Sequence, residues 1–200
     1  MRSGKGLWAV LASVPLAVAL VGVARGEGDE KPKFLGVEAC AKLCHKSEPQ
    51  GNQLGIWEQS KHAEAYKRLL TPEAKEAGKK VGVDAPEKSD KCLKCHASGF
   101  GVPKELLDEG FTIEHGVQCE TCHGAGEFYK KKTVMKDRKK AAELGMVLGD
   151  EKTCLQCHND TAPTWKADRY TTKDGKKVGF DYAQMWPKIA HPLPKEKKEE

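Results

Sequence analysis

The sequence is poor in the large apolar side chains from which most proteins build a core. Only three of its 200 residues are isoleucine and five are phenylalanine, and the hydrophobic types together make up 38%. Burial of apolar surface stabilises a fold by roughly 25 cal/mol per Å², and this gain must offset the entropy lost when the chain becomes ordered. The composition therefore indicates that a cofactor fills part of the interior.

Neither sign of charge dominates the sequence. It has 34 basic and 29 acidic residues and a net charge of +5, which falls to +2 without residues 1–26 because that segment holds three basic residues and no acidic one. Such a balance excludes a strongly basic nucleic-acid-binding protein. The lysine-rich stretches YKKKTVMKDRKK and KEKKEE are interleaved or mixed in sign. We interpret them as solvated faces rather than as a docking patch.

A long apolar run occurs only near the N-terminus. Residues 1–26 combine a basic start, the run LWAVLASVPLAVALVGV and small residues after it, which predicts a cleavable signal peptide and export, for example to a bacterial periplasm. The alternative is an uncleaved anchor, because this run of 17 residues could just span a thin bilayer. Membrane association is expected only in that case. The remainder, 27–200, is predicted to be one domain with flexible ends at 27–33 and 195–200.

No cysteine stands alone. The eight cysteines form four pairs, and a histidine directly follows each pair. In chain order the motifs are Cys40–Cys44–His45, Cys92–Cys95–His96, Cys119–Cys122–His123 and Cys154–Cys157–His158. A spacing of two residues, found in three of them, is typical of covalent haem c attachment, in which each thiol binds a haem vinyl group and the histidine binds the iron. The sequence predicts four covalent haem c groups with the four motif histidines as proximal ligands.

The first motif departs from this spacing, because three residues separate Cys40 from Cys44. Its trailing His45 still favours haem, attached by two thioethers across a bulged loop or by one. Structural zinc and disulfides are the alternatives for all four pairs. A four-ligand zinc site does not require a histidine after each pair, and disulfides would also leave the four histidines unexplained.

Histidine is too scarce to give every iron two histidine ligands. Of seven histidines, four belong to the motifs, which leaves His62, His115 and His191 as candidate distal ligands. One iron must therefore take another ligand or remain open. Met135 is the thioether candidate, because it is an isolated apolar residue in a lysine-rich stretch, although methionine is usually a packing residue. Deprotonated lysines would compete there: Lys131, Lys132 and Lys136.

The spare histidines have different surroundings. Residues around His62 recur at helical spacing, so we expect one helix that buries His62 together with Tyr66 and Leu69. A buried imidazole needs a partner, either an iron or a backbone group. His191 ends the aromatic-rich segment FDYAQMWPKIAH, which we expect to dock rather than to remain a solvated tail. His115 could bind an iron or a haem propionate.

Local patterns predict a mainly α fold with little β. Thr71 and Pro72 are typical of the start of a surface helix, and DRKKAAELG predicts a second helix that ends at Gly145. Strand patterns are weak throughout, and the motifs do not recur at a fixed period. We therefore expect short helices and loops wrapped around four closely packed haems.

The chain resembles the tetrahaem cytochrome c-554 family of nitrifying bacteria. The resemblance rests on SKHAEAY, CLKCHASGFG, FTIEHGVQCETCHGAGEFY and FDYAQMWPKIAH, and it covers nearly all of residues 27–200. It implies a mostly helical fold, haems stacked in close pairs, and electron transfer from hydroxylamine oxidoreductase. It also implies three irons with two histidine ligands and a five-coordinate second iron.

Position by position, the resemblance makes His62 the distal ligand of the fourth haem and His191 that of the third. The family's distal ligand to the first haem follows the third motif, where this sequence has no histidine and Met135 lies nearest. His115 has no clear counterpart and could close the second haem.

Three functions fit these features. The first is an exported electron carrier between redox proteins, a donor and an acceptor. The second is a haem enzyme that acts on a small nitrogen-oxide-type substrate at an open iron. The third is a subunit of a membrane complex or of a cytochrome filament. The sequence favours the electron carrier, names no partner and leaves the oligomeric state open.

Overall fold

The computed structural model of the chain describes residues 30–192. The predicted signal peptide, residues 1–26, and the predicted tail, 195–200, lie outside the described residues. No helix within the described part is both long enough and apolar enough to cross a membrane.

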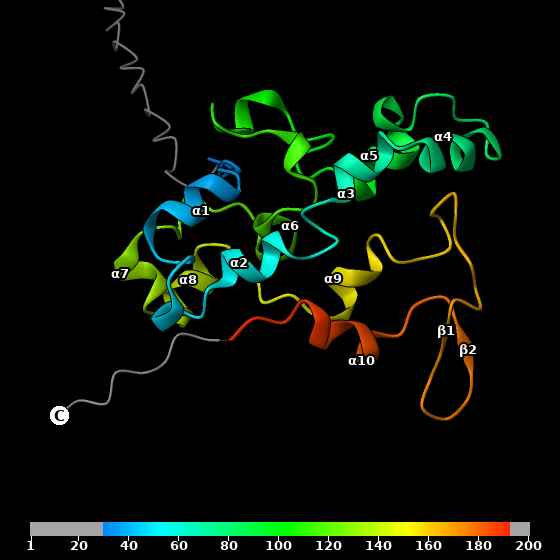
Figure 1. The fold of residues 1–200 in the computed structure, drawn as a ribbon. Helices are drawn as coiled ribbons and strands as arrows, with labels where there is room; N and C mark the ends of the chain where they lie inside the picture. Colours follow the sequence, from blue (N-terminus) through cyan, green and yellow to red (C-terminus); the bar gives the residue numbers. More distant parts are fainter. Residues whose placement is uncertain (1–29, 193–200) are drawn as a thin grey trace, which may run out of the picture. The chain divides into compact units, whose positions relative to one another are not determined.

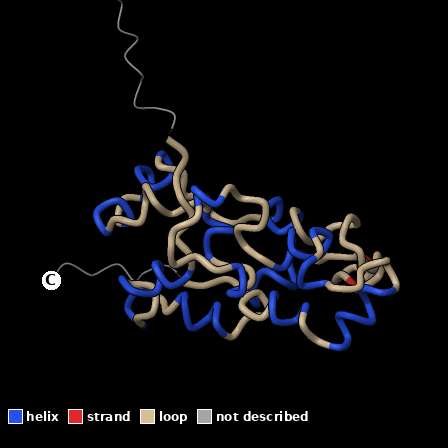
Figure 2. Tube along the Cα trace, turned by 90° about the horizontal axis from the view of Figure 1, so that it is seen from above, coloured by secondary structure: helices blue, strands red, loops and turns tan. Residues whose placement is uncertain are grey.

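Short helices separated by loops make up nearly all of the described chain, which confirms the mainly α prediction (Figures 1 and 2). The longest has eight residues. The α-helices are α1 (Val37–Leu43), α2 (Gln53–Glu58), α3 (Ala65–Leu69), α4 (Pro72–Lys79), α5 (Asp90–His96), α6 (Cys119–His123), α7 (Lys132–Met135), α8 (Arg138–Glu143), α9 (Glu151–Leu155) and α10 (Tyr182–Met185). The 3-10 helices are η1 (Glu48–Gln50), η2 (Pro86–Lys88), η3 (Lys104–Leu106), η4 (Ile113–His115) and η5 (Trp186–Lys188).

The regular β structure described is one small hairpin. Strands β1 (Tyr170–Thr171) and β2 (Lys177–Val178) pair antiparallel, with Tyr170 opposite Val178. Gly175 has φ 81° in the connecting turn, a conformation that favours glycine. The weak strand patterns in the sequence agree with this.

Two helices predicted from the sequence are confirmed: one that starts after Thr71 and one that ends near Gly145. The Thr71 side chain accepts a hydrogen bond from Ala74 N at the beginning of α4, and Pro72 occupies the first turn. The Asp137 side chain accepts from Lys140 N and begins α8, which ends at Glu143 shortly before Gly145, whose φ is 95°. Side-chain oxygens at these positions satisfy backbone N–H groups that have no partner within the helix.

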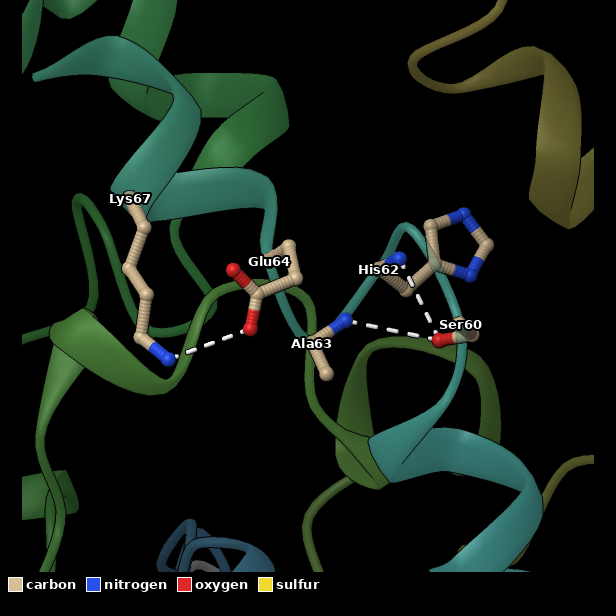
Figure 3. Close-up of polar contacts among 5 residues, drawn as sticks. All are labelled: Ser60, His62, Ala63, Glu64 and Lys67. Carbon is tan, nitrogen blue, oxygen red and sulfur yellow. Dashed lines mark hydrogen bonds and ion pairs between the residues drawn. The ribbon is translucent and has the colours of Figure 1, made fainter. Parts of the chain in front are cut away.

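The predicted continuous helix around His62 is wrong. Helix α2 ends at Glu58 and α3 begins at Ala65, so His62 lies in a turn between them. The Ser60 hydroxyl oxygen accepts hydrogen bonds from His62 N at 3.2 Å and Ala63 N at 3.4 Å (Figure 3). A serine that binds the backbone locally competes with helical hydrogen bonds, and the helix is interrupted here.

The described residues pack into two small apolar clusters rather than a large core. One cluster centres on Leu69, Leu93 and Ala97, where α3 packs against α5. The other centres on Tyr129, Val134 and Ala141, where α7 and α8 lie side by side (Figure 1). Clusters of three buried residues provide little apolar burial, as the composition predicted.

Candidate haem-binding sites

The four cysteine motifs lie on or directly after short helices. The third motif is the whole of α6, the second forms most of α5, and the first and fourth continue beyond the ends of α1 and α9. All eight cysteines are free and partly buried. Within residues 30–192 no three His, Cys, Asp or Glu side chains converge as a metal-binding cluster. Each helix holds the paired thiols close together, with the histidine at or after its C-terminal end.

Cysteines of different motifs are neighbours in space. A hydrogen bond with Cys119, more than burial, raises the pKa of the Cys40 thiol. In the same way a hydrogen bond with Cys95 raises the pKa of Cys157, while it lowers the pKa of Cys95 to about 7. The first motif therefore adjoins the third, and the second adjoins the fourth. We call these pairs the first–third couple and the second–fourth couple.

Three motif histidines are held through Nδ1 by an oxygen acceptor. His96 Nδ1 lies 2.8 Å from Ala65 O, and His123 Nδ1 lies 2.8 Å from Val147 O. His45 Nδ1 lies 3.2 Å from an oxygen of Gln53. An imidazole that donates from Nδ1 keeps its lone pair on Nε2, which is the tautomer that binds a metal. These contacts fix the orientation of the three rings.

The His62 ring faces the fourth motif. Its centre lies 6.3 Å from the centre of His158, with 53° between the planes. A metal ion bound by two imidazole nitrogens at about 2 Å each would hold ring centres about 6 Å apart. Burial lowers the pKa of His62, and burial together with the nearby His62 lowers that of His158, so both rings are neutral at pH 7. His158 also stacks on Phe180 at 4.7 Å.

The turn that carries His62 is held by the segment leading to the third motif. Val117 N donates to His62 O at 2.9 Å, and Trp57 Nε1 donates to Val117 O at 2.7 Å. Gly116 has φ 71°, and a side chain there would come within 2.5 Å of His62 O. The backbone approach therefore requires glycine at position 116.

His191 lies beside the third motif. Its ring centre is 5.8 Å from that of His123, with 49° between the planes. Burial, more than the nearby His123, lowers the pKa of His191 and keeps it neutral. The adjacent Pro192 O accepts a hydrogen bond from the Gln53 amide, so the end of this segment is docked. Two facing pairs of imidazoles, next to paired thiols, are a donor set that fits haem c.

The second motif borders a cavity of about 340 Å³. Its walls include Arg68, Thr71, Ala77, Val81 and Pro86, together with the motif's own Cys92, Cys95 and His96. Among the described residues that line it, His96 is the only histidine and none is methionine. His115 ends η4, which packs on α3, and it is not one of the lining residues. His115 is therefore not part of the wall of this cavity, and its role as an iron ligand stays a prediction.

The structure places Met135 at the end of α7, partly buried against Tyr129, Val134 and Ala141. Met146 packs on the same cluster. This is the packing role that methionine usually has, and its role as an iron ligand stays a prediction. The competing lysines are all exposed: Lys131, Lys132 and Lys136.

Two buried polar residues at the third motif did not stand out in the sequence. Glu120, 2% exposed, accepts hydrogen bonds from the backbone N–H of Leu35, Gly36 and Gly126. Gln118, also 2% exposed, accepts one from Val37 N at 2.8 Å. The bonds to Gly36 and Val37 join the segment that enters α1 and the first motif to the third motif, which lies more than 80 positions further along the chain. A polar residue between two cysteines gives no sequence signal of such contacts.

Comparison with known proteins finds a family similarity over the first three motifs. Residues 39–124 match the family model described as cytochrome c554 and c-prime. The solved structure of reduced cytochrome c554 from Nitrosomonas europaea is 25% identical, with 80% of this chain and 79% of that chain covered and a TM-score of 0.47. None of the curated proteins matches the chain. Residues 39–124, which span the first three motifs, are thus similar to the cytochrome c554 and c-prime family.

Proposed function

We propose that the chain is an exported tetrahaem cytochrome that passes single electrons between a donor protein and an acceptor protein. The proposed thioether positions are Cys40, Cys44, Cys92, Cys95, Cys119, Cys122, Cys154 and Cys157. His45, His96, His123 and His158 are the proposed proximal ligands. Haem iron, when bound, accepts one electron and releases it again.

The facing histidine pairs are the observation that carries this proposal. His62 and His191 come from distant parts of the chain, yet each ring lies within 6.3 Å of a motif histidine. Two imidazoles per iron favour a low-spin centre for electron transfer rather than for catalysis. The protein supplies imidazole rings in fixed orientations, and its thiols would tether the haems close together.

Contacts between motifs support a continuous electron path. Cys40 contacts Cys119, and Cys95 contacts Cys157. Cys122 lies close enough to Cys154 for the charge of one to act on the other. These three contacts support the order first, third, fourth, second for transfer between motifs.

Mass spectrometry of the exported protein together with electron paramagnetic resonance tests the proposal. We expect the mass of the chain from about residue 27 onward plus four haems, and low-spin signals from at least two irons. A bare polypeptide, or only high-spin iron, would contradict it.

A second candidate function rests on the cavity at the second motif. His96 is the only histidine among the described residues that line this space, which supports an iron open to a small molecule. We expect a minority of high-spin haem in the absorption spectrum and a shift of that fraction with cyanide. A wholly low-spin spectrum that cyanide leaves unchanged would exclude this activity.

A further inference from the structure

Glu120 is a buried carboxylate without a cation partner among residues 30–192. It lies in the spacer between Cys119 and Cys122 and is 2% exposed. Its oxygens accept N–H groups from Leu35 at 2.9 Å, Gly36 at 2.8 Å and Gly126 at 2.7 Å. Neither ion pair found among the described residues includes it. All its partners are donors, and only the ionised carboxylate accepts at both oxygens without presenting a proton of its own.

The negative charge of Glu120 lies beside the first–third couple. It acts on Cys40, on Cys119 and on the hydroxyl of Tyr129, which donates to Gly124 O at 2.7 Å. Charges interact more strongly in a buried site than in water, because little solvent screens them. An electron added nearby raises the local negative charge and is therefore disfavoured by this carboxylate.

On the basis of the proposed function, we propose that Glu120 is a positioning residue with two effects on the first–third couple. It holds the segment that enters the first motif against the third motif. Its charge also lowers the reduction potential of the haems tethered there, so that electrons reside preferentially at the second–fourth couple. Each step is the transfer of one electron from an added reductant to one iron, with no bond made or broken.

Glu127 provides a matched control. Its carboxylate accepts Lys33 N at 2.7 Å, from the same entering segment, but it does so in an exposed position. Glu120→Gln removes the buried charge and nearly keeps the volume, whereas Glu127→Gln removes a partly buried charge whose one backbone bond is exposed. A third variant, Glu120→Asp, keeps the buried charge but shortens its reach to the three N–H groups.

The experiment is a reductive titration with dithionite, followed by haem absorbance, together with a haem count by mass for each variant. In Glu120→Gln we expect the midpoints of two of the four haems to rise and the other two to remain in place. In Glu127→Gln we expect no shift. In Glu120→Asp we expect a lower melting temperature with the midpoints of the natural protein.

The outcomes separate the inference from the proposed function. Four haems with unchanged midpoints in Glu120→Gln overturn the charge effect, as does an equal shift in Glu127→Gln. If Glu120→Gln does not fold and bind haem, Glu120→Asp tests the charge effect instead. Raised midpoints in that variant would overturn the charge effect, because aspartate retains the negative charge. An unchanged melting temperature in Glu120→Asp overturns the positioning role. A natural protein without haem overturns the proposed function itself.

Discussion

The two couples of motifs are joined by different kinds of contact. In the first–third couple, Glu120 and Gln118 bind four backbone N–H groups of residues 35–37 and 126. In the second–fourth couple, the rings of His62 and His158 face each other across 6.3 Å, and a cavity of about 340 Å³ borders His96. Both couples include a facing histidine pair, since His191 faces His123 at 5.8 Å in the first–third couple, but that couple is also tied together by hydrogen bonds of the polypeptide.

This difference indicates which couple depends more on its cofactor. A buried carboxylate with all its hydrogen bonds made holds its partners whether or not haem is present. Two imidazoles that face each other without a direct bond, such as those of His62 and His158, hold their two segments together only when a metal binds both rings. Haem should therefore contribute more to the stability of the second–fourth couple.

Removal of the fourth haem should have the largest effect. We expect Cys154→Ala combined with Cys157→Ala to destabilise the protein by more than about 4 kcal/mol, since His62 and His158 lose their shared partner. Thermal unfolding followed by circular dichroism measures this, with mass spectrometry to confirm that one haem is missing. Cys40→Ala combined with Cys44→Ala removes the first haem and should cost less, because the Glu120 bonds remain. An equal or larger loss in that control would break the comparison.

Glu120→Ala should come next. It leaves three buried N–H groups without an acceptor, at about 1–3 kcal/mol for each group. We expect a loss of several kcal/mol in urea unfolding and poor incorporation of the first and third haems. Glu127→Ala, which removes one exposed bond, should stay within about 0.5 kcal/mol of the natural protein. Similar losses of unfolding free energy in Glu120→Ala and Glu127→Ala would show that the burial of Glu120 does not increase its contribution to stability.

Local features were predictable from the sequence. The helix start at Thr71 depends on a hydroxyl three residues from the N–H it binds, and the cysteine motifs depend on spacings of a few residues. The mainly α fold follows from many such local preferences. The same kind of reasoning failed at His62, because helical periodicity took no account of the Ser60 hydroxyl that interrupts the helix.

Contacts between distant residues were not predictable in this way. Glu120 binds Gly36 across 84 positions, and nothing in the spacer of a cysteine motif marks that residue as an acceptor. The division into couples likewise depends on tertiary contacts between Cys40 and Cys119 and between Cys95 and Cys157. Only the pairing of His62 with the fourth motif and of His191 with the third was expected, through the family resemblance. Their role as ligands stays a prediction.

Loss of a distal histidine should change one iron in each couple. We expect His62→Ala to convert one low-spin iron to high spin in the second–fourth couple, and His191→Ala to do so in the first–third couple. Electron paramagnetic resonance counts the centres. His115→Ala is the matched control, because this histidine does not line the cavity beside His96, and it should leave the count unchanged. A change in the control alone would assign the ligand role to His115.

Alkaline pH should weaken the first–third couple selectively. Burial, with a smaller contribution from the Glu120 charge, raises the pKa of Tyr129 above its usual value of 10.0. The neutral hydroxyl donates to Gly124 O, and this stability is complete below pH 10 and declines as pH rises further, because the unfolded state then releases the proton more readily. Tyr129→Phe should cost about 1 kcal/mol at pH 7 and remove this part of the alkaline decline. Urea unfolding of both proteins at pH 7 and at pH 10.5 measures this decline. If Tyr129→Phe loses as much stability between the two pH values as the natural protein does, the assignment to Tyr129 is wrong.

The smallest effect is expected at the edge of the cavity in the second–fourth couple. Thr71→Ala removes the side chain that accepts from Ala74 N at the start of α4, and helix caps of this kind contribute about 1 kcal/mol. Thr71 also lines the cavity beside His96, so its loss should loosen that wall and increase the fraction of haem that binds cyanide. Thr133→Ala is the control, since Thr133 is exposed in α7 on the other couple and alanine favours a helix. A stability loss without any change in cyanide binding would show that α4 does not control access to the cavity.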